Sequence, residues 1–236
     1  MAASRYRHLL STRILWAVVF LSAVLFAALS AAAMWAFPGG TEFDPSASRY
    51  RFWTNTFSDL GRMRTRGGVS NARSAALYHT ALAGLGAGLL AAWWALATLI
   101  PSQKRLGRAV RVCGIFSVLG TFGVALTPAD VTPLGHALAI GLAAVPALVA
   151  MVALVVGTWR EVGCPRWLAA WATAVLLLAA IHFGQYAHYY WLGGQWTPAA
   201  PAVQKLLALT GLGFLMAVSL RGLLNRGGRP TYPARR

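Results

Sequence analysis

Long apolar runs with few or no charges dominate the amino-acid sequence. A helix needs roughly 20 such residues to cross the hydrocarbon core of a bilayer. The chain reaches or approaches this length six times, which predicts transmembrane helices at about 14–35, 75–100, 110–127, 134–159, 167–190 and 203–220. The pattern therefore predicts an all-α, polytopic membrane protein in which residues 1–236 form a single six-helix domain.

The composition supports this assignment. Hydrophobic residues make up 58% of the chain and charged residues only 11%, whereas a soluble domain has about 25% charged residues. A water-soluble enzyme could not cover its surface with so few charges, and a disordered chain would contain fewer aliphatic and aromatic residues. The first run holds 22 uncharged residues, more than the roughly 7 to 15 of a signal-peptide core, so we expect a retained helix.

The connections between the runs are short except for one. Residues 36–74 form a long outer loop, and residues 225–236 read as a disordered tail. Thr132 is a plausible N-cap for the fourth helix, with Pro133 at its first helical position. Cys113 and Cys164 read as packing residues, and we expect no structural disulfide.

The distribution of Lys and Arg predicts the orientation, because short cytoplasmic loops carry an excess of both. With the N-terminus inside, 14 of the 21 Lys and Arg residues lie on the cytoplasmic side. Both termini are then cytoplasmic, although six arginines in the outer loop oppose the rule. The net charge of +16 is spread over loops without a nucleic-acid-binding motif. We therefore expect a membrane lipid or a hydrophobic small molecule as partner, and no nucleic acid.

The rare ionisable residues gather on the outer side in this topology: Asp59, His79, Asp130, His136, His182, His188 and Lys205. Ionisable side chains inside apolar runs usually face the bundle interior or a cavity. Each also has a simpler interpretation. Asp59 could be a helix cap, Asp130 could close a turn, the histidines could be hydrogen-bonded interfacial residues, and Lys205 could snorkel outward.

Two short motifs carry a resemblance to a known family. They are Asn55-x-x-Ser58-Asp59-Leu60-Gly61, and Gly123-x-x-x-x-Pro128-x-Asp130 followed six residues later by His136. The region from Asn55 to Val149 resembles the bacterial multi-pass membrane family called domain of unknown function 998. The resemblance implies a small helical bundle in a bacterial cytoplasmic (inner) membrane, highlights Ser58, Asp59, Gly61, Pro128, Asp130 and His136, and brings no established activity.

A wider similarity links the chain to the seven-helix membrane hydrolases that include alkaline ceramidases, in which Ser, Asp and three His surround zinc. Those enzymes have a His-x-x-x-His pair late in the chain, whereas this chain has His182 and His188 six residues apart. Six residues turn an ideal helix by about 120° away from a shared face. Any zinc site must therefore draw its ligands from several helices.

Three functional hypotheses follow. The first is a hydrolase or transferase acting on a lipid at the outer leaflet, assisted by zinc. His136 with His79, His182 or His188 would bind the metal, Asp130 would be a ligand or acceptor, Asp59 the general base and Ser58 a further catalytic residue. Residues that would bind the substrate are Arg62, Arg64, Arg66 and Arg73 for a phosphate headgroup, with Lys205, Trp191 and Tyr186.

The second hypothesis is a metal-free cyclase or isomerase of prenylated or terpenoid substrates. Asp59 and Asp130 would be the acids, and aromatic rings would stabilise a carbocation. The third is a non-enzymatic sensor, assembly factor or small transporter. Transporters usually contain helices broken at mid-bilayer, and Gly and Pro here gather mainly at helix ends.

Overall fold

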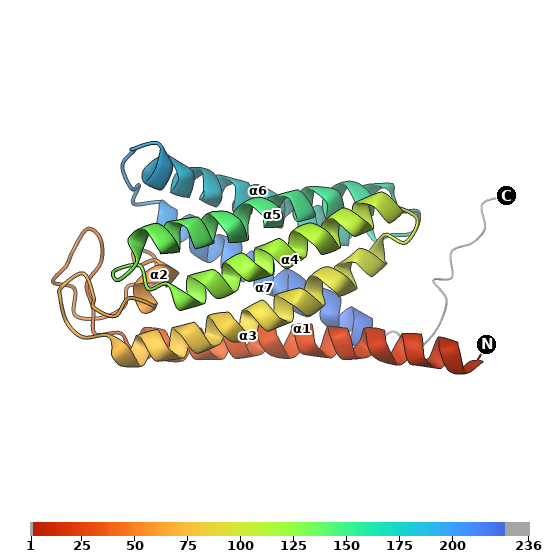
Figure 1. Cartoon of the computed structure of the whole chain (residues 1–236), viewed down its shortest axis with the longest axis horizontal. Helices are drawn as coiled ribbons and strands as arrows, with labels where there is room; N and C mark the ends of the chain where they lie inside the picture. The colour runs from red at the N-terminus through yellow and green to blue at the C-terminus, as the bar shows by residue number, and fades with distance from the viewer. Residues whose placement is uncertain (1, 225–236) are drawn as a thin grey trace.

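The computed structural model describes residues 2–224, and the predicted disordered tail at 225–236 lies outside them. Six long helices lie roughly side by side in an elongated bundle (Figure 1). They are α1 (Ala2–Ala36), α3 (Ala72–Leu96), α4 (Lys104–Leu126), α5 (Pro133–Arg160), α6 (Arg166–Trp191) and α7 (Ala200–Leu224). Each is long and apolar enough to cross a membrane. The predicted all-α, six-helix, multi-pass fold is confirmed.

The two ends of the bundle differ in their connections. The long connection between α1 and α3 lies at one end, which we call the loop end, and α1 begins and α7 ends at the opposite end, which we call the termini end (Figure 1). The long connection contains one unpredicted turn of helix, α2 (Phe57–Leu60), and a 3-10 turn, η1 (Ala97–Leu99), follows α3. The loop end therefore carries most of the irregular backbone within the described residues.

Helix boundaries depart from the prediction where charged residues occur. The third predicted helix begins at Lys104 instead of residue 110, because Lys and Arg are good helix formers and a helix can continue through them. Hydrophobicity marks the membrane boundary rather than the helix end. Thr132 occupies the N-cap position of α5 and Pro133 its first helical position, as predicted. The Thr132 side chain makes no capping hydrogen bond and instead donates to the Pro128 carbonyl oxygen at 3.4 Å.

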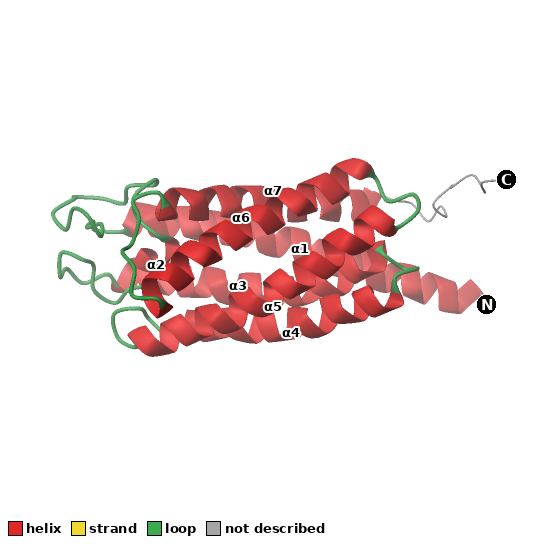
Figure 2. Cartoon of the chain, turned by 90° about the horizontal axis from the view of Figure 1, so that it is seen from above, coloured by secondary structure: helices red, strands yellow, loops and turns green. Residues whose placement is uncertain are grey.

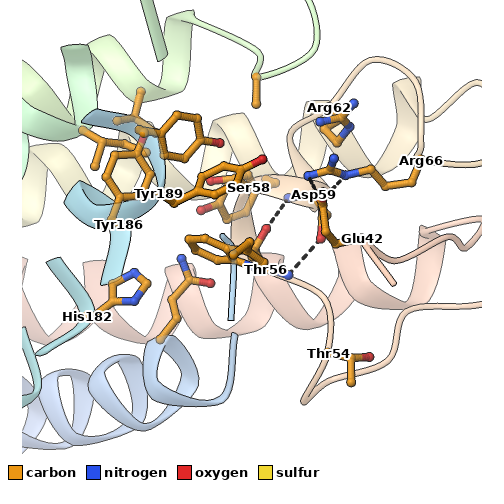
Figure 3. A pocket seen from close by; sticks show the side chains of 17 residues that line it. Glu42, Thr54, Thr56, Ser58, Asp59, Arg62, Arg66, His182, Tyr186 and Tyr189 are labelled. Carbon is orange, nitrogen blue, oxygen red and sulfur yellow. Dashed lines mark hydrogen bonds and ion pairs between the residues drawn. The ribbon is translucent and has the colours of Figure 1, made fainter. Parts of the chain in front are cut away.

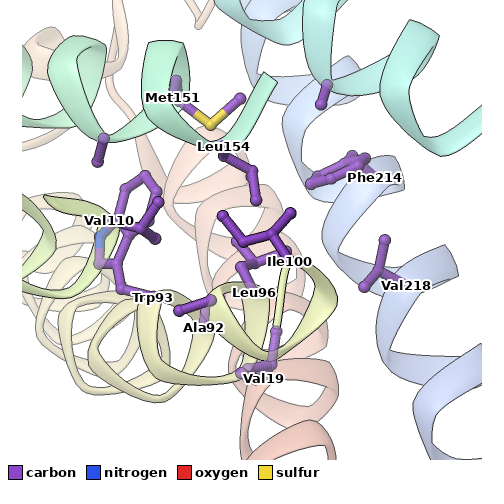
Figure 4. Packing of buried hydrophobic residues seen from close by; sticks show 14 of the residues in the cluster. Val19, Ala92, Trp93, Leu96, Ile100, Val110, Met151, Leu154, Phe214 and Val218 are labelled. Carbon is purple, nitrogen blue, oxygen red and sulfur yellow. The ribbon is translucent and has the colours of Figure 1, made fainter. Parts of the chain in front are cut away.

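Two helix pairs form the closest contacts, α1 with α3 and α4 with α5 (Figure 2). Glycine permits the second approach, because a Cβ atom at Gly120 would overlap the backbone of Ala143 on α5. Large side chains fill the space between helices nearer the termini end, where Leu96, Ile100 and Leu154 are at most 2% exposed (Figure 4). The cluster is almost entirely apolar and is held by packing; the indole N–H of Trp93 within it has no hydrogen-bond partner among the described residues.

The outer faces of the helices are also apolar. Leu138 on α5 and Leu177 on α6 are 59% and 58% exposed. A bundle in water would place polar residues at such positions, whereas a bundle in lipid gains nothing from polar residues there. The exposed leucines therefore agree with the helix lengths: the chain is a multi-pass membrane protein.

Candidate functional site

The short helix α2 positions the residue at the centre of the candidate site, Ser58. A capping box holds its single turn: the Asp59 backbone N–H donates to Thr56 Oγ1 at 3.1 Å, and the Thr56 N–H donates to Asp59 Oδ2 at 2.8 Å. Leu60, fully buried, packs into an apolar cluster with Phe37 and Tyr78. The interpretation of Asp59 as a helix-cap residue is therefore what the structure shows.

Side chains from other segments tie α2 to the bundle. Asn55 accepts from the Arg51 N–H through Oδ1 and donates from Nδ2 to the Gly40 carbonyl oxygen. Its own carbonyl oxygen accepts from Lys205 Nζ at 2.8 Å, and the Phe57 N–H donates to Gln204 Oε1 at 2.8 Å. α7 thus holds both sides of the turn that precedes Ser58.

Lys205 departs from its predicted role. Its side chain is fully buried, and Nζ lies 4.3 Å from the centre of the Phe57 ring, with Tyr50 and Phe52 slightly farther away. The expectation that it snorkels outward is therefore wrong, because a carbonyl oxygen and three ring faces replace the water it would have sought. Burial, with the nearby Asp59 charge, raises the pKa of Tyr50, so its phenol stays protonated and donates to the Thr56 carbonyl oxygen.

Asp130 closes the loop end from the opposite side. Its carboxylate accepts from the backbone N–H groups of Met63 and Arg64, at 2.9 and 2.8 Å. Partial burial raises the pKa of Asp130, but these two backbone hydrogen bonds outweigh burial and leave that pKa below its ordinary value. Asp130 therefore clamps the outer loop to the α4–α5 turn as a carboxylate.

Ser58 faces a histidine on α5. Ser58 Oγ lies 3.2 Å from His136 Nε2, and His136 Nδ1 lies 2.6 Å from the Thr127 carbonyl oxygen. A carbonyl oxygen only accepts, so Nδ1 carries the proton and Nε2 offers its lone pair to the Ser58 hydroxyl. A hydroxyl, a base within hydrogen-bond reach and a third group that orients the base form the arrangement of an activated nucleophile.

His79 on α3 is arranged differently. Nδ1 faces the Ala125 carbonyl oxygen at 2.5 Å and Nε2 faces the Gly61 carbonyl oxygen at 2.9 Å. Both ring nitrogens point at backbone carbonyl oxygens, so neither is directed toward a position that it could share with the other histidines. His79 connects α3 to the end of α4 and to the turn after α2.

A pocket of about 170 Å³ opens beside Ser58. Figure 3 shows that its walls differ: His182, Tyr186 and Tyr189 of α6 lie on one side, and Glu42, Arg62 and Arg66 of the outer loop lie on the other. Arg66 forms ion pairs with Glu42 and with Asp59, and Arg62 donates through Nε to the Arg64 carbonyl oxygen. The pocket therefore has an aromatic wall and a charged wall whose formal charges balance.

The structure brings together part of the predicted site. Ser58, Asp59, Arg62, Arg66, His182 and Tyr186 line the pocket, and His136 lies behind Ser58. Asp130, His79, Arg64, Arg73, His188, Trp191 and Lys205 are not among the described residues that line it. Lining residues that were not predicted as site residues include Glu42, Tyr189, Tyr190 and Gln204. Gln204 carries a detectable signal, a polar residue opening an apolar run beside Lys205.

The predicted zinc ligands do not converge. Among residues that the structure describes, no three His, Cys, Asp or Glu side chains are grouped to hold a metal ion. His79 and His136 direct ring nitrogens to carbonyl oxygens, and His188 lies outside the pocket. The ligand set His79, His136, His182 and His188 does not fit a zinc centre, which needs about three convergent ligands.

Comparisons with family models, with curated proteins and with solved structures give no match. The function must therefore be argued from the geometry of the pocket.

Proposed function

We propose that the protein is a membrane-embedded serine hydrolase or acyl transferase that acts on a lipid at the loop end. One observation carries the proposal: Ser58 Oγ is 3.2 Å from His136 Nε2, and His136 Nδ1 donates to the Thr127 carbonyl oxygen. A serine with a base oriented by a third group is the recurring device for covalent acyl transfer. Ser58 also lines a pocket between helices long enough to span a membrane.

The reaction would proceed in two steps. Ser58 Oγ attacks the acyl carbonyl carbon while His136 Nε2 takes the hydroxyl proton, and the bond to the leaving group breaks as His136 returns that proton to it. Water, or the hydroxyl of a second molecule, then attacks the acyl-Ser58 ester and restores the serine. We assign Arg62 to stabilise the negative oxygen, because Arg66 already pairs with two carboxylates.

The two acids expected to act in catalysis take supporting positions in this proposal. Asp59 accepts from the Thr56 N–H and Asp130 from two backbone N–H groups. The bonds to Asp130 lower its pKa and favour its carboxylate form, and Asp59 is engaged in the capping box and with Arg66, whereas the terpenoid cyclase hypothesis needs a proton-donating acid. We therefore do not propose a cyclase or isomerase.

An activity probe tests the proposal without knowledge of the substrate. A fluorophosphonate forms a covalent bond with an activated serine, so we expect it to label the purified protein at Ser58, as read by mass spectrometry of the modified peptide. Ser58→Ala should abolish labelling, and His136→Ala should lower its rate at least about 100-fold. Ser70→Ala changes an exposed loop serine and is the matched control that should label normally.

Two outcomes would contradict the proposal. Labelling that persists in Ser58→Ala would place the reactive group elsewhere. A wild-type protein that is folded by size-exclusion chromatography and resists the probe would favour the non-enzymatic role of sensor, assembly factor or small transporter.

We further propose that the protein belongs to the domain of unknown function 998 family and lies in a bacterial inner membrane with both termini cytoplasmic. The excess of Lys and Arg at the termini end supports the orientation. Reporter fusions test the orientation. Green fluorescent protein fused after Leu224 should fluoresce if that end is cytoplasmic, and alkaline phosphatase inserted at Gly68 should be active if that loop is outside the cytoplasm. The reverse pattern would overturn the orientation.

A further inference from the structure

A second cavity continues from the pocket toward the centre of the bundle. It has a volume of about 240 Å³ and shares Ile140, His182 and Tyr186 with the pocket beside Ser58. Four helices surround it, α4, α5, α6 and α7. The two cavities are therefore adjacent, and a molecule bound beside Ser58 lies next to a cavity within the long helices.

One face of α5 forms the longest wall of this cavity. The lining positions follow the helical repeat, with a residue on the same face at each turn: Ile140, Ala143, Ala144, Ala147, Leu148 and Met151. At roughly 1.5 Å per residue the stripe is about 16 Å long, close to half of a bilayer core of about 30 Å. The cavity therefore matches the depth of one leaflet.

The residues that keep this space open are small. Ala143, Ala144 and Ala147 on α5 face Ala179 on α6 across it. The described lining is otherwise mainly aliphatic or aromatic and includes no Asp, Glu, Lys or Arg; its polar members are Ser117, Thr121, His182 and Tyr186. A space of this shape and polarity suits a hydrocarbon chain.

Polar atoms without partners mark the junction of the two cavities. Tyr186 is only 5% exposed, and its hydroxyl has no hydrogen-bond partner among the described residues. His182 Nδ1, one helical turn away, also lacks one. A buried hydroxyl that stays unpaired loses free energy, so its position where two cavities meet indicates a ligand atom that accepts or donates there.

We infer that this second cavity binds the acyl chain of a membrane lipid, with Tyr186 and His182 bound to the polar linkage between chain and headgroup. The inference deepens the proposed function and rests on it for the chemistry at Ser58, but the binding itself does not require catalysis. An ester or amide linkage offers a carbonyl oxygen to the Tyr186 hydroxyl. The headgroup would then lie in the pocket between the aromatic wall and the charged wall.

A photoreactive lipid tests the inference. The protein is reconstituted in vesicles of phosphatidylethanolamine and phosphatidylglycerol that contain a trace of phosphatidylglycerol with a diazirine in its acyl chain. After illumination, mass spectrometry should find adducts at Ala144 and Ala147. Val145 on the exposed face of α5 meets bulk lipid, so its adducts provide an internal reference.

A matched pair of variants provides the control. Ala179→Phe places a ring inside the cavity and should reduce the Ala144 and Ala147 adducts at least about tenfold while leaving the Val145 adducts unchanged. Ala180→Phe changes the neighbouring exposed position, which does not line the cavity, and should leave both sets unchanged. Size-exclusion chromatography confirms that each variant is folded. If Ala179→Phe aggregates, Ala144→Leu replaces it, and the adducts are then read at Ala147 alone.

A third variant tests the polar junction. Tyr186→Phe keeps the ring and removes only the hydroxyl, so the amount of photoreactive lipid needed for half-maximal Ala147 adducts should rise about fivefold. An unchanged requirement would overturn the role of Tyr186.

The results separate the two proposals. Absent Ala144 and Ala147 adducts, or adducts that Ala179→Phe leaves unchanged, overturn the acyl cavity even where Ser58 reacts with a fluorophosphonate. Adducts that persist in Ser58→Ala support the cavity, because binding needs no nucleophile. If the wild-type protein shows those adducts but resists the fluorophosphonate, the cavity stands and the hydrolase proposal falls.

Discussion

The loop end and the termini end of the bundle are stabilised in different ways. Near the termini end, buried hydroxyl groups bond within their own helix, as Ser219 does with the Leu215 carbonyl oxygen at 2.6 Å. At the loop end, polar side chains reach between segments far apart in the sequence, as Lys205 does with Asn55 and Gln204 with Phe57. The termini end is held by apolar packing, whereas the loop end combines an apolar cluster with directional hydrogen bonds between segments.

The proposed hydrolase function gives this difference a physical reason. Apolar packing tolerates small displacements, because dispersion contacts have little directionality. A hydrogen bond between a hydroxyl and an imidazole requires correct positions within a few tenths of an ångström. Ser58 lies on a short helix in a long loop, so the surrounding hydrogen bonds must supply the rigidity that a longer helix would provide.

The largest effect should come from enlarging a glycine in the packed region. A Cβ atom at Gly114 on α4 would overlap the buried Trp93 ring and its Cβ. Gly114→Leu should therefore lower the free energy of unfolding by at least about 4 kcal/mol or prevent folding, as measured by thermal unfolding in detergent micelles. Gly184→Leu is the control, because nothing lies within 4 Å of a Cβ there. Equal destabilisation by both would refute close packing at Gly114.

A smaller effect is expected at the buried lysine. Lys205→Ala leaves a cavity among three aromatic rings and removes the donor to the Asn55 carbonyl oxygen, which should cost about 3 kcal/mol. Lys205→Met keeps most of the volume and should cost about 1 kcal/mol. If the two variants are equally stable, the hydrogen bond contributes more than packing at this position. That result would strengthen the contrast between the hydrogen-bonded loop end and the apolar termini end.

The smallest effect concerns Asp130. Asp130→Asn keeps one acceptor oxygen for two backbone N–H groups, so it should lose about 1 to 2 kcal/mol of stability. The pKa of Asp130 is lowered in the folded protein, so the wild-type carboxylate contributes stability above its unfolded pKa of about 3.9. That contribution is lost as the pH falls through the folded pKa. The stability difference between wild type and variant should therefore shrink at acidic pH, and a difference independent of pH would contradict the clamp.

The length of the apolar runs was sufficient to predict the six long helices, but it could not predict how the residues of the candidate site come together. Six helices follow from run length, because lipid demands about 20 residues per crossing. The role of Asp59 had a correct simple interpretation as a helix cap, and Ser58 and His136 were both singled out. Their contact across 78 residues of sequence could not be predicted, because nothing local specifies how the outer loop folds back onto α5.

Two errors share a cause. Lys205 was expected to reach water, and the histidines were expected to share a metal, because sequence alone treats ionisable groups as seeking solvent or a cation. The structure offers carbonyl oxygens instead, from Asn55 to Lys205 and from Thr127 to His136. Every residue has a backbone carbonyl oxygen, so the residue types in a sequence do not indicate which carbonyl oxygen will accept a given hydrogen bond.

By itself the sequence determined that the long helices are suited to lipid, how many such helices there are and which ionisable residues to test. It could do so because the free energy of placing a segment in lipid depends on its hydrophobicity, its length and its charges. Only the tertiary structure decided which of those residues meet. Hydrogen bonds from Asn55, Asp130 and Lys205 fold the outer loop onto the helix ends, and that folding brings the Ser58 hydroxyl to the His136 ring.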